Sequence, residues 1–194
     1  MSFLLDAAKK HQSGDFRCAA GLYKAFLREN AESAEALNLY GLCMLELGNF
    51  HRAEALFSDA IRCNPENSEF YQNRGATRLG IGKIALALAD FETGLCHAPD
   101  NHRCLLEAGR ASIDLQEIDK AVKFFEKALD IAKNDESAIV GLSYSLSLRG
   151  LRETKEKNFG AAIKDLTQAL NLCPETWEIL YNLGNAYLKS GDYE

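Results

Sequence analysis

The sequence predicts an all-α protein built from a repeated pair of antiparallel helices. Three observations lead to this prediction. The same chemical pattern returns at an interval of 34 residues, each copy holds two apolar-periodic runs separated by a tight turn, and each copy ends on a residue that can cap the next helix.

The clearest copy of the pattern runs from Ala34 to Asn67. Its first apolar run contains Gly41, the Gly-Asn pair at 48–49 breaks that run, and a second run opens at Phe50. Pro65 follows the second run, and a residue without an N–H and with a fixed φ ends helix propagation. The copy therefore predicts a helix, a turn, a second helix and a stop.

Small residues in both helices predict where the two helices of each copy approach closely. Antiparallel helices come close only where a side chain is missing, so we expect the small residues of the first helices to face the alanines of the second. The first-helix column is Gly41, Gly75, Gly109, Ser143 and Gly184. The second-helix alanines are Ala19, Ala53, Ala87, Ala121 and Ala162, with large residues beside them at Tyr23, Phe57, Phe91, Phe125 and Leu166.

The last residue of each copy predicts a helix N-cap, because its side-chain oxygen can accept from a free backbone N–H. These residues are Ser33, Asn67, Asn101, Asp135 and Thr176. They divide one array into repeats at 1–33, 34–67, 68–101, 102–135 and 136–176, with a partial repeat at 177–194. The turn glycines Gly14, Gly48 and Gly82 give way to Gln116 in the fourth copy.

The fifth copy contains seven additional residues near 151–157. Seven residues make nearly two helical turns, so a helix can absorb them while almost preserving the direction that its side chains face. The segment LRETKEK is rich in helix formers, and we expect one or both helices of this pair to extend into a charged tip. A disordered loop beginning at Gly150 is the alternative.

The sixth copy supplies a first helix from Trp177 to about Ser190, and Tyr193 would open its second helix. We expect the natural chain to continue beyond Glu194, because terminal repeats usually carry a polar outer face and this helix keeps an interior pattern. In the alternative, Leu180, Leu183 and Tyr187 belong to a closing helix with an uncovered apolar stripe that self-association or a partner protects.

Composition excludes several classes of protein. The net charge of -6 argues against nucleic-acid binding, which needs clustered Lys and Arg. The start lacks the basic region of a signal peptide, and no apolar run is long enough to enter and span a bilayer. Six dispersed cysteines predict free thiols, which is typical of a cytoplasmic protein.

No motif indicates catalysis, a cofactor or a metal. The stretch CHAPDNHRC places Cys96, His97, His102 and Cys104 near one turn, but structural zinc sites use other spacings, so we expect ordinary turn residues. The stretch RLGIGK lacks the glycine, the Ser/Thr and the preceding strand of a phosphate loop.

The period, the paired helices and the small and aromatic columns resemble the tetratricopeptide repeat (TPR) family. This resemblance implies an α-solenoid of about five and a half stacked helix pairs, wound into a right-handed superhelix whose first helices line a concave face. It implies a peptide-binding groove made by the first-helix residues that point away from the packing columns. These are Asn38, Leu42, Leu45, Gln72, Asn73, Ala76, Arg103, Leu106, Glu107, Arg110, Val140, Tyr144, Tyr181, Asn182 and Asn185.

Two groups within the family refine the comparison. Members that bind chaperone tails carry a basic and asparagine clamp for a terminal carboxylate, and Glu35 and Glu69 occupy much of the matching territory here. Arrays that precede bacterial O-linked glycosyltransferase domains carry an asparagine ladder, which Asn73 and Asn182 match and Glu107 does not. The chain is therefore similar to these arrays only in part.

Three functional hypotheses follow. The first is a non-enzymatic scaffold that binds a partner protein's peptide or helix in its groove. The second is a substrate-recognition arm of a larger enzyme, such as a glycosyltransferase. The third is a self-assembling structural protein in which the end of the sixth repeat docks on another copy, forming a homo-oligomer.

Overall fold

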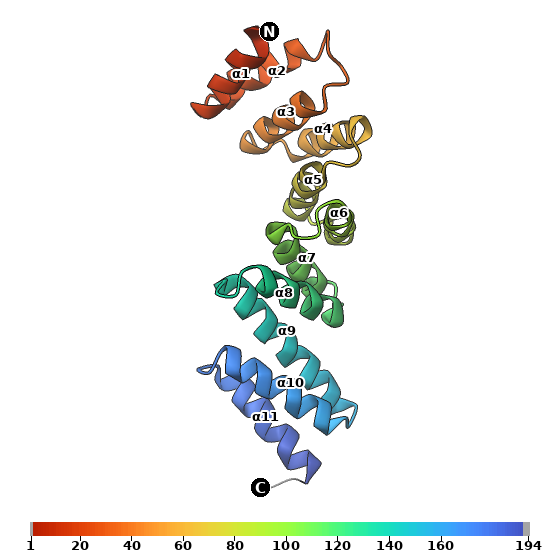
Figure 1. Cartoon of the computed structure of the whole chain (residues 1–194), viewed down its shortest axis with the longest axis vertical. Helices are drawn as coiled ribbons and strands as arrows, with labels where there is room; N and C mark the ends of the chain where they lie inside the picture. The colour runs from red at the N-terminus through yellow and green to blue at the C-terminus, as the bar shows by residue number, and fades with distance from the viewer. Residues whose placement is uncertain (1, 192–194) are drawn as a thin grey trace. The chain divides into compact units, whose positions relative to one another are not determined.

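The structure, a computed structural model, describes residues 2–191, and within this range it contains eleven α-helices and no strand (Figure 1). The all-α prediction is confirmed; Tyr193, the expected start of a further helix, lies outside the described residues. The helices are α1 (Ser2–Gln12), α2 (Phe16–Phe26), α3 (Ala34–Glu46), α4 (Phe50–Cys63), α5 (Ser68–Gly80), α6 (Ile84–His97), α7 (His102–Asp114), α8 (Ile118–Ile131), α9 (Glu136–Lys155), α10 (Phe159–Leu172) and α11 (Trp177–Ser190).

The chain divides into two compact units. Unit 1 (Met1–Pro99) contains α1 to α6, and unit 2 (Asp100–Glu194) contains α7 to α11. In each unit consecutive helices pack as antiparallel pairs and each pair packs on the next, which is the arrangement of an α-solenoid. Buried alanines, aromatic rings and aliphatic side chains fill the space between the helices.

The five predicted capping residues all lie at helix N-caps. The side chains of Ser33, Asn67, Asn101 and Asp135 accept a hydrogen bond from a backbone N–H in the first turn of the following helix. Thr176 lies at the N-cap of α11, but its side chain makes no such bond.

The tight turns inside the helix pairs use a left-handed residue. Gly48 has φ of 74°, and Gln116 and Lys157 take the same conformation in later pairs with φ of 61° and 66°. Glycine adopts this conformation without a steric penalty, whereas a residue with a Cβ costs about 1–2 kcal/mol. The turns after α7 and α9 therefore carry strain that the earlier turns avoid.

The first-helix glycines Gly41, Gly75 and Gly109 lie directly against aromatic rings of the second helices. A Cβ added at Gly41 would come within 2.6 Å of the Phe57 ring, and one at Gly75 within 2.7 Å of the Phe91 ring. The large residue beside each alanine is therefore the nearest neighbour of the glycine. The missing side chain makes room for a ring that is fully buried.

Helix α9 absorbs the additional residues of the fifth repeat. It contains 20 residues, whereas α3, α5 and α7 contain 13 each, and it reaches Lys155 without a break. Helix α10 keeps an ordinary length of 14 residues, so only the first helix of this pair extends. The alternative of a loop beginning at Gly150 is wrong. The tip of the pair is exposed and charged, at 155–157.

The packing of α9 shows that the additional residues of the fifth repeat lie before Gly150, and not at the predicted positions 151–157. A Cβ at Gly150 would come within 2.7 Å of Leu166 on α10, so Gly150 fills the role that Gly75 fills in unit 1. Both glycines precede their partner by the same number of residues. The assignment of Ser143 to this column is therefore wrong; the buried Ser143 hydroxyl instead donates to the carbonyl of Ala169 at 2.9 Å.

Candidate functional site

Two adjoining cavities in unit 2 lie along α9. The first, of about 420 Å³, is lined by Arg110, Ile113, Phe125, Glu136, Ser137, Val140, Gly141 and Tyr144. The second, of about 380 Å³, is lined by Val140, Ser143, Tyr144, Ser147, Leu148, Leu151, Cys173, Thr176, Glu178, Ile179 and Asn182. Val140 and Tyr144 line both cavities, and we call the two together the α9 groove.

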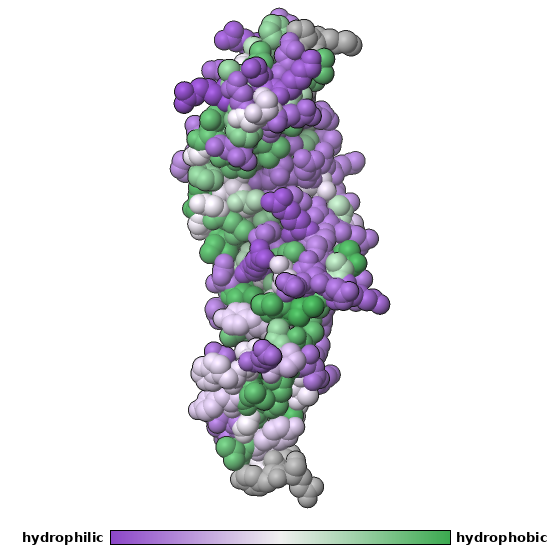
Figure 2. Space-filling view, turned by 90° about the vertical axis from the view of Figure 1, so that its left-hand side faces the viewer, coloured by the Kyte–Doolittle hydropathy of each residue, from purple (hydrophilic) through white to green (hydrophobic). Residues whose placement is uncertain are grey.

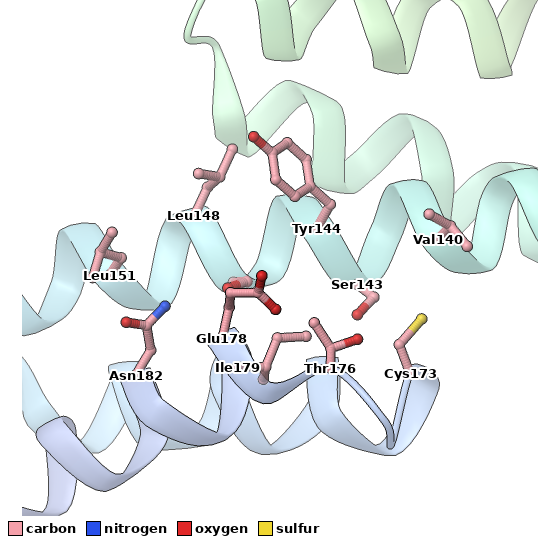
Figure 3. A pocket seen from close by; sticks show the side chains of 11 residues that line it. Val140, Ser143, Tyr144, Leu148, Leu151, Cys173, Thr176, Glu178, Ile179 and Asn182 are labelled. Atoms are coloured by element: carbon pink, nitrogen blue, oxygen red, sulfur yellow. The ribbon is translucent and has the colours of Figure 1, made fainter.

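One face of α9 forms the apolar wall of the groove. Val140, Tyr144, Leu148 and Leu151 are four, four and three residues apart, a spacing that aligns side chains on one side of a helix. Figure 3 shows these side chains along α9, with those of the α10–α11 turn and the first turn of α11 opposite. Val140 and Tyr144 are 58% and 54% exposed, although both are large and largely apolar.

The extension of α9 explains why this wall is open. Because Gly150 and not Ser143 packs against Leu166, α10 and α11 lie about two turns further along α9 than in an ordinary repeat. The early turns of α9 therefore pack against α8, where Gly141 meets the ring of Phe125, and leave their other side uncovered.

Ion pairs hold α9 in place. Arg149 binds Asp165 on α10 through two hydrogen bonds of 2.6 and 2.8 Å, and Arg152 binds Asp119 on α8 at 3.0 and 3.2 Å. The bond from Arg152 lowers the pKa of the Asp119 carboxyl, which favours the charged form that the ion pair needs. The wall of the groove is thus anchored to the helices on both sides.

The N-terminus of α9 is anchored as well. The capping carboxylate of Asp135 accepts from the backbone N–H of Ala138 at 2.7 Å and from Nε2 of His102 at 2.9 Å. The bond from His102, followed by the backbone bond, lowers the pKa of Asp135. This residue therefore couples the start of α7 to the start of α9.

Polar groups line the groove beside its apolar wall. Arg110 and Glu136 lie in the first cavity, where the Arg110 guanidinium donates to Glu107 at 3.2 Å. Glu178 and Asn182 lie in the second cavity, and the Asn182 amide makes no hydrogen bond within residues 2–191. The groove therefore offers an apolar wall beside a guanidinium, carboxylates, an amide and hydroxyl groups, which suits an extended backbone with apolar side chains.

Four of the residues expected in the groove line it, namely Arg110, Val140, Tyr144 and Asn182. The other expected residues of unit 2 lie elsewhere. Leu106 packs on the core, Arg103 is exposed outside the cavities, and Tyr181 is exposed on another face of α11. Asn185 is half-buried on α11 outside both cavities.

The expected groove residues of unit 1 bond to one another in part. Asn38 is buried, donates to Glu69 at 3.2 Å, and accepts from the Asn73 amide at 2.9 Å. The amide of Asn38 therefore joins α3 to α5. Leu42 and Leu45 pack on the core, while Gln72 and Ala76 are half-buried.

The sequence reasoning missed Leu148, Leu151, Cys173, Thr176 and Ile179. The sequence does contain a signal that predicts Leu148 and Leu151. Gly150 lies as many residues before Leu166 as each earlier packing glycine lies before the aromatic residue that it contacts. That spacing would have placed the extension before Gly150 and aligned Leu148 and Leu151 with Tyr144.

The residues near 96–104 have ordinary structural roles. The His97 ring stacks on Tyr71, His102 binds Asp135, and burial raises the pKa of the Cys104 thiol to about 11. Among residues 2–191, no three His, Cys, Asp or Glu side chains are grouped so that they could hold a metal ion. None of the described helices combines the length and apolar character needed to cross a bilayer.

Comparison with known families gives four matches along the chain. Models described as "Tetratricopeptide repeat" match residues 12–68, 56–89 and 79–143, and one described as "TPR repeat" matches residues 150–191. No curated protein matches the chain.

Several solved structures share the fold. MamA from Desulfovibrio magneticus RS-1 (residues 41 to the end) is 20% identical, with 88% of this chain and 92% of that chain covered and a TM-score of 0.70. YrrB, described as "a TPR protein with an unusual peptide-binding site", is 15% identical, with 93% and 90% covered and a TM-score of 0.73. The first TPR of Spaghetti (RPAP3), bound to the HSP90 peptide SRMEEVD, is 21% identical, with 58% and 89% covered and a TM-score of 0.56.

Proposed function

This chain belongs to the tetratricopeptide repeat family, and on that premise we propose that it is a protein-interaction scaffold whose α9 groove holds a peptide of a partner protein. The observation that carries the proposal is the exposure of Val140 and Tyr144 between two adjoining cavities. Large apolar side chains at such a position usually mark an interaction surface. The peptide bound by RPAP3 and the peptide-binding site of YrrB support this general role.

The groove favours a ligand with apolar side chains at its centre. An aliphatic or aromatic side chain fits beside Leu148, Leu151 and Ile179, where it is removed from water and contributes about 1.5–3 kcal/mol. The Asn182 amide can donate to a peptide carbonyl and accept from a peptide N–H. The carboxylate of Glu178 at the edge of the cavity favours a neutral or basic peptide over an acidic one.

A displayed library of random peptides tests the proposal. Peptides selected on the immobilised chain are synthesised and titrated by fluorescence anisotropy against the wild type and the double variant Val140→Ser, Tyr144→Ala. Because both residues are exposed, the variant keeps its fold, and we expect a loss of affinity of about tenfold or more.

The control is Leu86→Ser, which removes a similarly exposed apolar side chain from α6 in unit 1. It should leave the affinity unchanged. Selected peptides that bind the groove double variant as tightly as the wild type would show that the binding surface lies elsewhere.

A further inference from the structure

The side chain of Asn38 in unit 1 shows how this fold binds a carboxamide. Its amide donates to the Glu69 carboxylate at 3.2 Å, and its oxygen accepts from the Asn73 amide at 2.9 Å. Glu69 and Asn73 lie four residues apart on α5, so both face the same side of that helix. A carboxamide from α3 is therefore held between two polar groups of α5, and Asn38 is only 5% exposed.

Helices α9, α10 and α11 of unit 2 repeat the spacing of α3, α4 and α5. A Cβ at Gly150 would come within 2.7 Å of Leu166, and one at Gly41 would come within 2.6 Å of Phe57. Each glycine lies the same number of residues before the side chain that it meets, and the N-cap of the next helix follows that side chain at the same interval. The positions of the three helices in each unit can therefore be compared one by one.

The comparison finds on α11 the same two groups that α5 offers to Asn38. Glu178 and Asn182 follow the N-cap of α11 by two and six residues, as the bonding carboxylate and amide of α5 follow theirs. Ser147 holds the place of Asn38 on α9, three residues before the packing glycine. A serine has no carboxamide, so unit 2 lacks the group that unit 1 supplies from its own chain.

The two groups on α11 are open to a ligand. Ser147, Glu178 and Asn182 line the same cavity of about 380 Å³, and Figure 3 shows the side chains of Glu178 and Asn182 pointing from α11 towards α9. Within residues 2–191 none of these three side chains makes a hydrogen bond. The cavity therefore contains an unused acceptor and an unused donor at the positions that bind Asn38 in unit 1.

A ligand group that satisfies both must donate to the Glu178 carboxylate and accept from the Asn182 amide. A carboxylate has no proton to donate and is repelled by Glu178, whereas an ammonium loses its water in a cavity with an apolar wall. A backbone peptide group is trans, so its N–H and C=O point in opposite directions and do not reach both residues. A primary carboxamide presents its donor and its acceptor at one end, as Asn38 does.

We propose that the α9 groove selects peptides that carry an asparagine or glutamine side chain, which lies between Glu178 and Asn182 in the way that Asn38 lies between two residues of α5. The carboxamide nitrogen donates to the Glu178 carboxylate, and the Asn182 amide donates to the carboxamide oxygen. This inference rests on the proposed peptide-binding function and names the chemistry that gives it specificity.

Apolar surroundings define the residues beside the carboxamide. Leu148, Leu151 and Ile179 line the same cavity, and Figure 2 shows apolar and weakly hydrophilic residues gathered near the C-terminal end of unit 2 on the face that it displays. Hydrogen bonds in such surroundings are stronger than in water, because the local dielectric constant is lower. We expect the selected peptides to place aliphatic or aromatic residues on either side of the asparagine or glutamine.

Filling the site from the chain itself tests the proposal. Peptides selected from the displayed random library on the wild type should share an asparagine or glutamine at one position. In the variant Ser147→Asn the new side chain takes the place that Asn38 has in unit 1 and competes with the ligand. This variant should bind the selected peptides at least about tenfold more weakly in anisotropy titrations, because each loses a hydrogen bond to a charged group.

The matched control is Thr167→Asn. It adds the same side chain at an exposed position of α10 that lines neither cavity of the groove, so it should leave the affinity unchanged. Circular dichroism checks that both variants keep the helical content of the wild type. A folded Ser147→Asn variant that binds the selected peptides as tightly as the wild type would overturn the proposal.

A second measurement does not depend on filling the site. Each selected peptide is synthesised with its carboxamide, with the isosteric carboxylate and with lysine at that position. The wild type should bind the carboxylate form at least about tenfold more weakly than the carboxamide form, because the carboxylate meets Glu178. In the variant Glu178→Gln this ratio should fall to about threefold or less, since the repulsion is removed. A lysine form that binds as tightly as the carboxamide form would assign the site to a cation and refute the proposal.

The outcomes separate this inference from the proposed function. Selected peptides that lose affinity in the Val140→Ser, Tyr144→Ala variant but share no asparagine or glutamine would contradict the carboxamide site and leave the peptide-binding groove supported. Peptides that bind the double variant as tightly as the wild type would overturn both.

Discussion

Single glycines set the distance between the two helices of a pair. In α5, the position of Gly75 is fixed by the Phe91 ring, whose Cε1 atom would lie 2.7 Å from an added Cβ. Real Cβ contacts are longer than this, so the ring and the helix backbone are in direct contact. The same geometry recurs at Gly41 and Gly109, which explains why the small residue keeps its place in the period.

A substitution at this position tests the argument, because two effects oppose each other. Alanine favours an α-helix over glycine by about 1 kcal/mol, but Gly75→Ala also forces the Phe91 ring to move within a full core. We expect the overpacking to dominate and the free energy of unfolding to fall by about 1–3 kcal/mol. Urea unfolding followed by circular dichroism measures the change.

The control for this prediction is Gly160→Ala in α10. Its added Cβ meets nothing within 4 Å, so only the helix propensity changes and the protein should become slightly more stable. If both variants gained stability, the close contact between Gly75 and Phe91 would not limit the packing.

At the scale of the element, the sequence predicts the helices better than it predicts their register. The capping residues Asn67 and Asn101 and the fixed period place most helix starts, because these signals are local in the chain. In the fifth repeat, Ser143 and Gly150 both offer a small residue seven positions apart, and either can face α10 after nearly two turns. Only packing against Leu166 distinguishes them.

The groove depends on that register and was predictable only in part for the same reason. Arg110 and Tyr144 were found because the first-helix positions they occupy are set by the period. Leu148 and Thr176 were not, because they face the groove only when α10 and α11 lie two turns further along α9. Likewise, the bond between Asn38 and Asn73 joins two helices and has no signature in either one.

Helix α9 is expected to behave as one continuous element. Its C-terminal turns carry the Arg149 and Arg152 ion pairs and the buried Thr154, whose hydroxyl donates to the Gly150 carbonyl at 2.8 Å. We therefore predict slow amide exchange from Leu151 to Lys155, comparable to α10. The exposed turn at 156–158 provides the comparison within the same protein and should exchange rapidly. Rapid exchange beginning at Leu151 would mean that the helix ends at Gly150 in solution.

At the scale of the whole molecule, stability should be local, because each unit has its own core. One set of buried residues runs from Ala7 to Phe70 in unit 1, and another runs from Ala121 to Ala186 in unit 2. In a repeat array each helix pair is stabilised by its neighbours, so a defect in one pair weakens the adjacent pairs most. A protein with a single shared core would instead lose stability everywhere at once.

Two equivalent substitutions distinguish these cases. Gly75→Ala lies in unit 1, and Gly109→Ala lies in unit 2, where an added Cβ would come within 2.7 Å of the Phe125 ring. We predict that Gly75→Ala accelerates amide exchange chiefly in α3 to α6 and that Gly109→Ala does so chiefly in α7 to α10. Hydrogen exchange read by mass spectrometry under mildly denaturing conditions resolves the two patterns. Equal acceleration over the whole chain in both variants would show that the two units unfold as one cooperative body, and the local cores would then not be independent sources of stability.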